Sequence, residues 1–387
     1  MSMQAMIQKS SSAERAFAAP DQPGEGHTGL GQADCVWWPW WRITLSELWV
    51  KEPNILKPIK YYCVDGTTQD AIPLTPNKAA FYRDAVGHWH MTGLDDVAAT
   101  DSICIPVHEA IRMAVYTRQE YEDSKRILES PFIYDAGIDA EMKISKDDFE
   151  KALAANSLAK RELHQALYWQ DYAFLLSNVQ SGLSEIISTA GAFYESFCSY
   201  EFVGIPKKER NGVRRTDSPE TRFATLLLHI IFVRMHSVLD YLVKLSLEVE
   251  RQGVNFDIYP KLRGLNAQFG DRKKIDINKA VGTVFEDCVF IRTIECVRTR
   301  IIHDGHLSPN QWIYEVWDGE KISERYILFP DMKGNPGSFD SSGNRRSFYG
   351  DDTKINAIIP AIIREFYTRT TLTLSMLRDK LLENRRW

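Results

Sequence analysis

The chain has 387 residues, of which 44% are hydrophobic and 26% charged, and its formal net charge at pH 7 is −5. This composition is typical of a globular protein with one large or two smaller domains, and it excludes a protein that coats nucleic acid through bulk positive charge. Any contact with RNA or DNA must therefore come from local basic patches.

Residues 1–32 are expected to form a disordered tail, because they are rich in small and polar residues and contain no apolar stretch typical of signal peptides. The six cysteines form no CxxC pair, so we expect neither a zinc site nor a disulfide scaffold. The longest apolar runs are shorter than the roughly 20 residues that a membrane-spanning helix needs. We therefore expect a cytoplasmic protein with no membrane segment, no metal and no cofactor.

Residues 33–144 are predicted to form a smaller β or α+β region that ends in a helix and a linker. Short runs of strand-forming residues are broken by turn residues, as at Tyr61–Val64 before Asp65-Gly66. From about residue 107 the pattern becomes helical, and a helix is predicted from Pro106 to Glu129.

Two features of this region are candidates for chemistry. The aromatic run Trp37–Trp41 is interpreted as core packing, because aromatic side chains bury the most area per residue. His88 and His90 resemble half of a metal site, although no acidic or cysteine partner was identified for them in the sequence. A metal-dependent enzyme centred on these two histidines is therefore kept as a less favoured alternative.

Residues 145–387 are predicted to form a helical domain. A capping-box variant at Ser145–Asp148 opens a long amphipathic helical region. A polar loop at 204–215 then leads to a second helix, which begins at Asp217-Ser218-Pro219 and runs to about Arg251.

A third helix is predicted from about Ile277 to His303, where Gly305 ends it. A β-hairpin at about 311–329 follows, and a last helix from Thr353 to about Asn384 is expected to kink at Pro360. The expected fold class is thus mainly α, a helical bundle with an inserted β-hairpin, preceded by the smaller N-terminal region.

The hexamer Arg298-Thr299-Arg300-Ile301-Ile302-His303 ends the third helix and carries the strongest functional signal. Cleaving RNA without a metal needs a base, an acid and a cation that stabilises charge on the phosphate. Histidine can be the acid or the base near neutral pH, and the planar fork of arginine matches phosphate oxygens. The negative end of the helix dipole would favour protonated His303.

The spacing of Arg298 and His303 constrains such a site. At about 100° per residue, five residues separate the two side chains by roughly 140° around the helix. They do not converge on one straight helix. A site that uses both therefore needs a groove between helices or a second copy of this helix from a partner chain.

The hexamer resembles the motif of HEPN domains, which occur in prokaryotic toxins, phage-defence nucleases and CRISPR effectors. The family motif is Arg, a polar residue that is usually Asn, Asp or His, three variable residues, and His near the end of a core helix. Arg298 and His303 match it, the following Asp304-Gly305 is also similar, and Thr299 departs from the usual Asn. The resemblance covers roughly residues 160–387.

The resemblance implies a homodimer in which two motifs face each other and form one composite ribonuclease site. Arg298 and His303 would carry catalysis, with Thr299, Asp304 and Asp240 in supporting roles. The basic residues that are candidates for RNA contact are Arg300, Lys207, Lys208, Arg214 and Arg215. The implied partners are RNA, a second copy of the chain, and an antitoxin or defence-system protein.

Two further interpretations of the hexamer stay open. Thr299 favours a catalytically inactive HEPN scaffold that binds nucleotide or a partner protein. Alternatively, Arg298 and Arg300 are ordinary surface residues, and His303 stands at the helix end only because the dipole favours a cation there.

Overall fold

The computed structural model describes most of the chain after Ile59, and all of its described elements lie in the unit Pro58–Trp387. The described residues are 59–70, 79–94, 96–128, 145–155, 160–199, 211–251, 253–277, 280–307, 311–330, 349 and 352–386. The expected tail at 1–32, the aromatic run Trp37–Trp41 and the basic pair Lys207 and Lys208 lie outside these residues.

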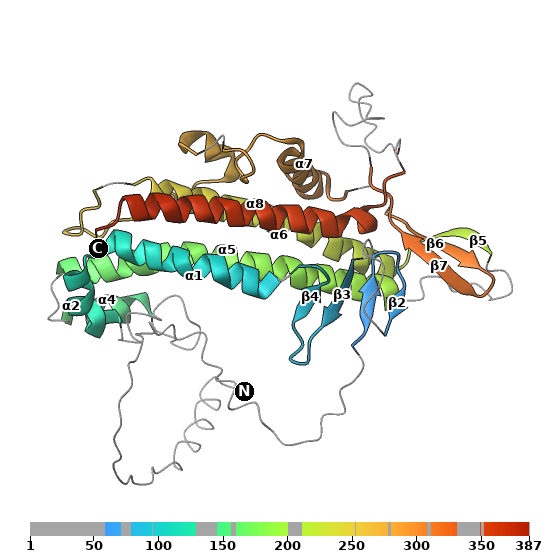
Figure 1. The fold of residues 1–387 in the computed structure, drawn as a ribbon, viewed down its shortest axis with the longest axis horizontal. Coiled ribbons are helices and arrows are strands. Elements are labelled where there is room, and N and C mark those ends of the chain that lie inside the picture. Colours follow the sequence, from blue (N-terminus) through green and yellow to red (C-terminus); the bar gives the residue numbers. More distant parts are fainter. Residues whose placement is uncertain are drawn as a thin grey trace, which may run out of the picture. The chain divides into compact units, whose positions relative to one another are not determined.

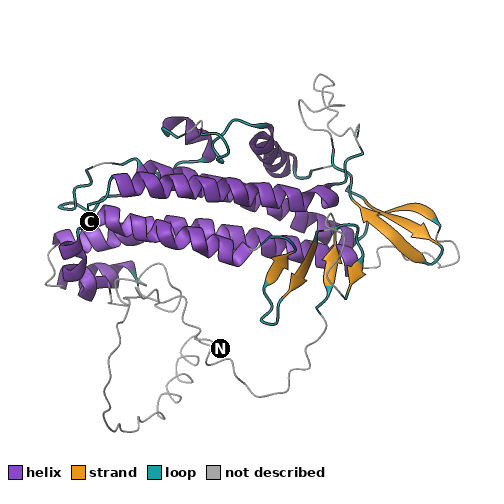
Figure 2. Ribbon diagram, viewed as in Figure 1, coloured by secondary structure: helices purple, strands orange, loops and turns teal. Residues whose placement is uncertain are grey.

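Four long helices form the core of this unit (Figures 1 and 2). They are α1 (Asp96–Val115), α5 (Lys160–Ser199), α6 (Pro219–Val249) and α8 (Ile355–Glu383). Helix α5 packs along α6, and α1 packs against both α5 and α8. The chain is therefore mainly α, as the sequence predicts.

Shorter helices surround this bundle. They are α2 (Arg118–Leu128), α4 (Lys146–Ala155), the 3-10 helix η5 (Phe269–Lys274) and α7 (Val289–Asp304). Helix α2 packs against α5, whereas η5 and α7 both pack against α6. Helix α7, which carries the hexamer, thus lies outside the four long helices (Figure 1).

Two antiparallel sheets lie near one end of the bundle (Figure 2). The first has the order β2-β1-β3-β4 and consists of β1 (Tyr61–Cys63), β2 (Thr68–Gln69), β3 (Ala80–Arg83) and β4 (Trp89–Met91). The second has the order β5-β6-β7 and consists of β5 (Gly212–Thr216), β6 (Ile313–Asp318) and β7 (Lys321–Tyr326). The first sheet packs on α5.

Close contact between α5 and α6 depends on a missing side chain. A Cβ atom at Gly182 of α5 would lie 2.5 Å from Cγ2 of the buried Val238 of α6. Real Cβ atoms do not approach other carbon atoms so closely. Glycine at this position therefore sets the separation of the two helices.

A buried polar cluster joins the second sheet to the bundle. The guanidinium of Arg325 on β7 donates to Glu315 on β6 and to the carbonyl oxygens of Phe197 and Cys198, which end α5. Because the last carbonyls of a helix have no partner within the helix, Arg325 supplies the donors that they lack. Asn356 of α8 accepts from the Ile327 amide and donates to the Arg325 carbonyl.

The start signals of two helices are confirmed. Ser218 caps α6, because its hydroxyl accepts from the Thr221 amide at 3.2 Å. The Asp148 amide donates to the Ser145 hydroxyl at 3.1 Å, as a capping box requires, although the Asp148 carboxylate accepts from that hydroxyl rather than from the Ser145 amide.

The helix predicted from 106 to 129 is in fact two helices. Thr117 and Glu120 form a capping box of their own, in which the Glu120 amide donates to Thr117 Oγ1 and the Thr117 amide to Glu120 Oε2. This box ends α1 at Val115 and starts α2 at Arg118. Since α1 packs on α5 and α8, it is a bundle helix rather than part of a separate N-terminal region, and Pro58–Trp387 forms one unit.

Two other predicted elements differ. Helix α7 begins at Val289 and not near Ile277, because Arg369 of α8 binds the Thr283 carbonyl and the Glu286 carboxylate and holds the preceding residues in turns. The end of the predicted loop at 204–215 forms β5, an edge strand whose outer side faces solvent and whose sequence is therefore polar.

Helix α6 is long and apolar enough by composition to cross a membrane. The sequence predicts no such helix, because the uninterrupted apolar runs are short. Half of its most apolar window is buried within the protein, against the other helices of the unit. This burial is typical of a core helix in a helical bundle.

Candidate functional site

Helix α7 is attached to the bundle by one apolar stripe. Ile291, Ile294 and Val297 are buried and α7 contacts α6. Phe290 and Ile301, on either side of this stripe, are half-buried. Arg298 directly follows the last buried residue of the stripe, Val297.

The two residues expected to carry catalysis lie at the outer surface of α7. Arg298 is half-buried, and His303 and Thr299 are exposed. Within the described residues, no hydrogen bond or ion pair occupies the side chain of Arg298 or His303. Both can therefore approach a ligand without first breaking a contact that holds the fold.

The end of α7 is sharply defined. Gly305 follows the last helical residue, Asp304, with φ 81° in the left-handed region, a conformation that glycine adopts without strain. His303 thus stands in the last turn, and His306 and Leu307 leave the helix in a new direction. The expected glycine termination is confirmed.

The chain beyond α7 is fixed to α6 by a buried histidine. Nε2 of His229 accepts from the Gln311 side-chain amide at 2.8 Å and from the Leu307 backbone amide at 3.4 Å. Burial, together with the nearby His306, lowers the pKa of His229 to about 4. His229 is therefore a neutral acceptor at physiological pH, and it fixes the position of the segment that starts four residues after His303.

Asp240 contacts the start of η5. Its carboxylate accepts from the Phe269 amide at 2.6 Å and lies 3.6 Å from His236. Phe269 begins η5, and Arg272 of η5 forms a two-pronged ion pair with Glu295 of α7. Asp240 supports α7 through η5, since it anchors the element that braces the helix.

The basic candidates occupy two surfaces. Arg300 lies half-buried on α7, next to the catalytic candidates. Arg214 and Arg215 lie on β5, where Arg214 pairs with Glu315 and Arg215 with Tyr314 in the register with β6. The structure therefore places the basic residues of β5 beside the aromatic Tyr314 of β6, a pairing that the sequence does not predict.

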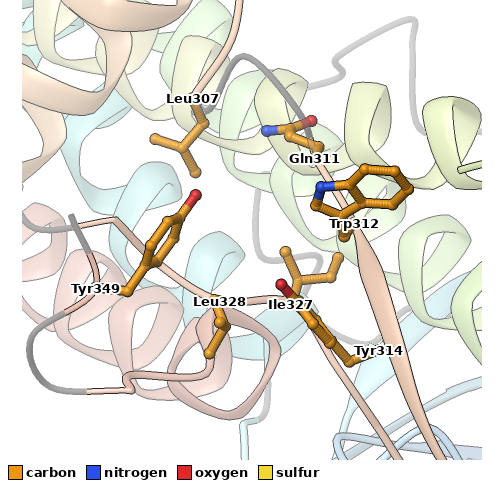
Figure 3. Close-up of a pocket in the computed structure, with 7 residues that line it drawn as sticks. All are labelled: Leu307, Gln311, Trp312, Tyr314, Ile327, Leu328 and Tyr349. Carbon is orange, nitrogen blue, oxygen red and sulfur yellow. The ribbon is translucent and has the colours of Figure 1, made fainter. Parts of the chain in front are cut away.

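A small pocket lies beside the end of α7 (Figure 3). It is shallow and opens to solvent, with a cavity volume of about 20 Å³, room for about one water molecule, and its lining residues are Leu307, Gln311, Trp312, Tyr314, Ile327, Leu328 and Tyr349. Gln311 and Leu307 are the residues that His229 holds in place. The sequence signal for this pocket is the pair of aromatic residues Trp312 and Tyr314, two residues apart, which by themselves indicate only a hairpin strand.

His88 and His90 do have an acidic neighbour in the structure. Nε2 of His90 lies 3.2 Å and Nδ1 of His88 3.8 Å from Oδ2 of Asp84. The other oxygen of Asp84 accepts from the backbone amides of Val86 and His88, so this carboxylate also forms the turn between β3 and β4. In the described part of the chain, no group of three or more His, Cys, Asp or Glu side chains is arranged to hold a metal ion.

Comparisons of this chain with protein-family models, with curated proteins and with solved structures found no match.

Proposed function

We propose that this protein is a metal-independent endoribonuclease whose active groups are Arg298 and His303. The observation that carries the proposal is their situation on α7. An arginine and a histidine with the spacing of the HEPN motif stand in the last turns of a braced helix, and within the described residues neither side chain has a hydrogen bond or an ion pair.

The proposed reaction follows from the chemistry of these two side chains. A histidine takes the proton of a ribose 2′-hydroxyl, and the 2′-oxygen attacks the adjacent phosphorus. The bond from phosphorus to the 5′-oxygen breaks, and a second histidine protonates that oxygen. The products are a 2′,3′-cyclic phosphate and a 5′-hydroxyl, and Arg298 stabilises the charge on the phosphate oxygens.

Two histidines imply two copies of α7. Because Arg298 and His303 are separated by roughly 140° around the helix, one copy of the helix does not direct both groups at one phosphate. Two copies related by a two-fold axis supply two of each, one histidine as base and the other as acid. We therefore propose a homodimer with a single composite site.

The biological setting is proposed from the HEPN resemblance alone. It is that of a cytoplasmic nuclease of a bacterial antiviral or toxin–antitoxin system, with RNA as substrate and an antitoxin or defence-system protein as a further partner. The alternative is a catalytically inactive scaffold, which Thr299 favours because it stands where the family usually has Asn.

The test is cleavage of labelled RNA by purified protein in the presence of EDTA. We expect His303→Ala to lower the rate by about 10² to 10⁴-fold, the usual contribution of a general acid or base. Arg298→Ala should have a loss of similar order, because a positioned charge on the phosphate is removed. The products should carry the cyclic phosphate.

Two matched variants control this experiment. Arg292 lies on the same helix, exposed and in an ion pair with Asp287, so Arg292→Ala should leave cleavage unchanged. His88→Ala should also be active, and a loss in that variant together with inhibition by EDTA would support a metal site at His88 and His90. Equal cleavage by the wild type and by His303→Ala would contradict the proposal, and absence of cleavage in the wild type would favour the scaffold.

A further inference from the structure

The outer side of the second sheet carries an unusual set of side chains. In β6, Ile313, Glu315 and Trp317 are buried, whereas Tyr314 between them points to the other side. Tyr314 pairs across the sheet with Arg215 of β5 and with Tyr326 of β7. Directly opposed residues of neighbouring strands lie on the same side of a sheet.

On this side of the sheet, two tyrosine rings stack on each other, and cationic side chains lie over a tryptophan ring and a tyrosine ring. Tyr314 and Tyr326 are parallel within 4°, with ring centroids 4.9 Å apart. The guanidinium of Arg215 lies 4.8 Å from the ring centre of Trp312. Lys354 lies 4.6 Å from the ring centre of Tyr326, and it also pairs with Glu324. We call Arg215, Trp312, Tyr314 and Tyr326 the aromatic face.

The pocket opens next to the aromatic face and shares two of its rings, Trp312 and Tyr314 (Figure 3). Tyr349 completes an aromatic lining, and Gln311 adds a side-chain amide that can both donate and accept. The cavity is too small to enclose a nucleobase, but flat rings with one amide at its mouth suit the stacking of a planar, polar heterocycle better than the binding of an aliphatic chain.

The pocket also adjoins the proposed active site. Leu307 forms part of its wall and follows His303 by four residues, and His229 binds both the Leu307 amide and the Gln311 amide. One strand of RNA could thus contact the end of α7 and the pocket together.

We propose that the aromatic face binds an unpaired segment of RNA, with one base stacked on its rings at the mouth of the pocket and Arg215 toward the phosphates. This inference rests on the proposed function for its choice of RNA, and it extends that function to a substrate class. A duplex does not fit, because its bases are stacked on each other and their flat sides are not available to protein rings.

The experiment measures binding separately from cleavage. The parent protein carries His303→Ala, so that RNA stays intact, and a short unstructured fluorescent RNA is titrated by fluorescence anisotropy. Trp312→Leu and Tyr314→Leu keep apolar bulk but remove a stacking ring. Each should weaken binding roughly tenfold, within the range known for loss of one base–aromatic stack.

Tyr241→Leu is the matched control. Tyr241 is half-buried on α6 beneath Lys244, whose Nζ lies 5.6 Å from its ring centre, so this variant removes a ring with a similar cation partner elsewhere in the bundle. It should bind RNA as the parent does. Circular dichroism melts of all variants identify any that fail to fold, and for such a variant Arg215→Ala serves instead, because that exposed side chain lies on an edge strand.

Preference for single-stranded over double-stranded RNA, lost in both ring variants and kept in the control, would support the proposal. Unchanged RNA binding in both ring variants, or equal binding of the duplex, would overturn it and leave a protein segment as the better occupant of the surface. Ring-dependent binding by a wild-type protein that cleaves no RNA would contradict only the proposed function, whereas cleavage without ring-dependent binding would contradict only this inference.

Discussion

His229 shows how a single buried side chain fixes the surroundings of the candidate site. It lies on α6 and is 7% exposed, and it accepts the hydrogen bonds that fix the chain after α7. Protonation would convert the accepting nitrogen into a donor that faces two other donors. The neutral form is therefore required for this arrangement.

This requirement predicts a loss of stability in acid. Above pH 6.5 His229 is neutral in the folded and unfolded states, so it adds no pH dependence. Between pH 6.5 and the folded pKa of about 4, only the unfolded state takes up the proton, and the free energy of unfolding should fall by up to about 3 kcal/mol. Urea unfolding at a series of pH values measures this decrease.

His229→Gln provides the comparison, because glutamine keeps an acceptor and does not titrate. Burial also lowers the pKa of His108 to about 4, and this contribution stays in both proteins. The variant should therefore lose part, and not all, of the acid sensitivity. The same pH dependence in both proteins would show that His229 is not the titrating group.

Arg325 provides a second test of a buried charge. In Arg325→Met, Glu315 would remain buried with an uncompensated charge, and two carbonyls at the C-terminal end of α5 would lose their donor, so we expect a loss of about 3–5 kcal/mol in urea unfolding. The double variant Arg325→Met with Glu315→Leu should recover a large part of this loss, because no charge is then left alone. A loss below about 1 kcal/mol in the single variant would contradict this account.

At the level of the helices, the close contact of α5 with α6 predicts that Gly182→Ala changes stability in opposite directions with and without the Val238 side chain. Alanine favours a helix over glycine by about 1 kcal/mol, but in Gly182→Ala the new methyl group collides with Val238, and overpacking costs about 1–3 kcal/mol. The substitution should destabilise the wild type. In a Val238→Ala background the collision is removed, and the same substitution should stabilise.

Thermal or urea unfolding of the four proteins of this cycle measures the coupling between the two positions. Stabilisation by Gly182→Ala in the wild-type background would mean that α5 and α6 adjust easily, and would contradict the close approach described here.

Helix boundaries with local signals were predicted from the sequence, whereas boundaries that depend on residues far away in the chain were not. The cap at Ser218 and the glycine at 305 are local, so the start of α6 and the end of α7 were predicted closely. The start of α7 depends on Arg369 of α8, more than 80 residues away in the chain, and no local pattern reveals it. Strand β5 likewise exists only because β6 pairs with it.

At the scale of the whole molecule, the sequence predicted the mainly helical fold and the hairpin, and it located the hexamer at a helix end. It did not reveal the pocket, because this combines the α7 exit, β6 and Tyr349. It also did not anticipate the role of Asp240 in anchoring η5. Features built from segments that are distant in the chain depend on tertiary packing, so no local sequence pattern reveals them.

The central claim is the proposal that two chains share one site, because one copy of α7 does not direct Arg298 and His303 at the same phosphate. The most direct measurement is the rate of RNA cleavage by a mixed dimer of one wild-type chain and one His303→Ala chain, separated by two affinity tags. A composite site would then lack either its acid or its base, so the rate should fall by about 10²-fold or more. A mixed dimer that retains half of the wild-type rate, or a wild-type enzyme active as a monomer, would contradict the account.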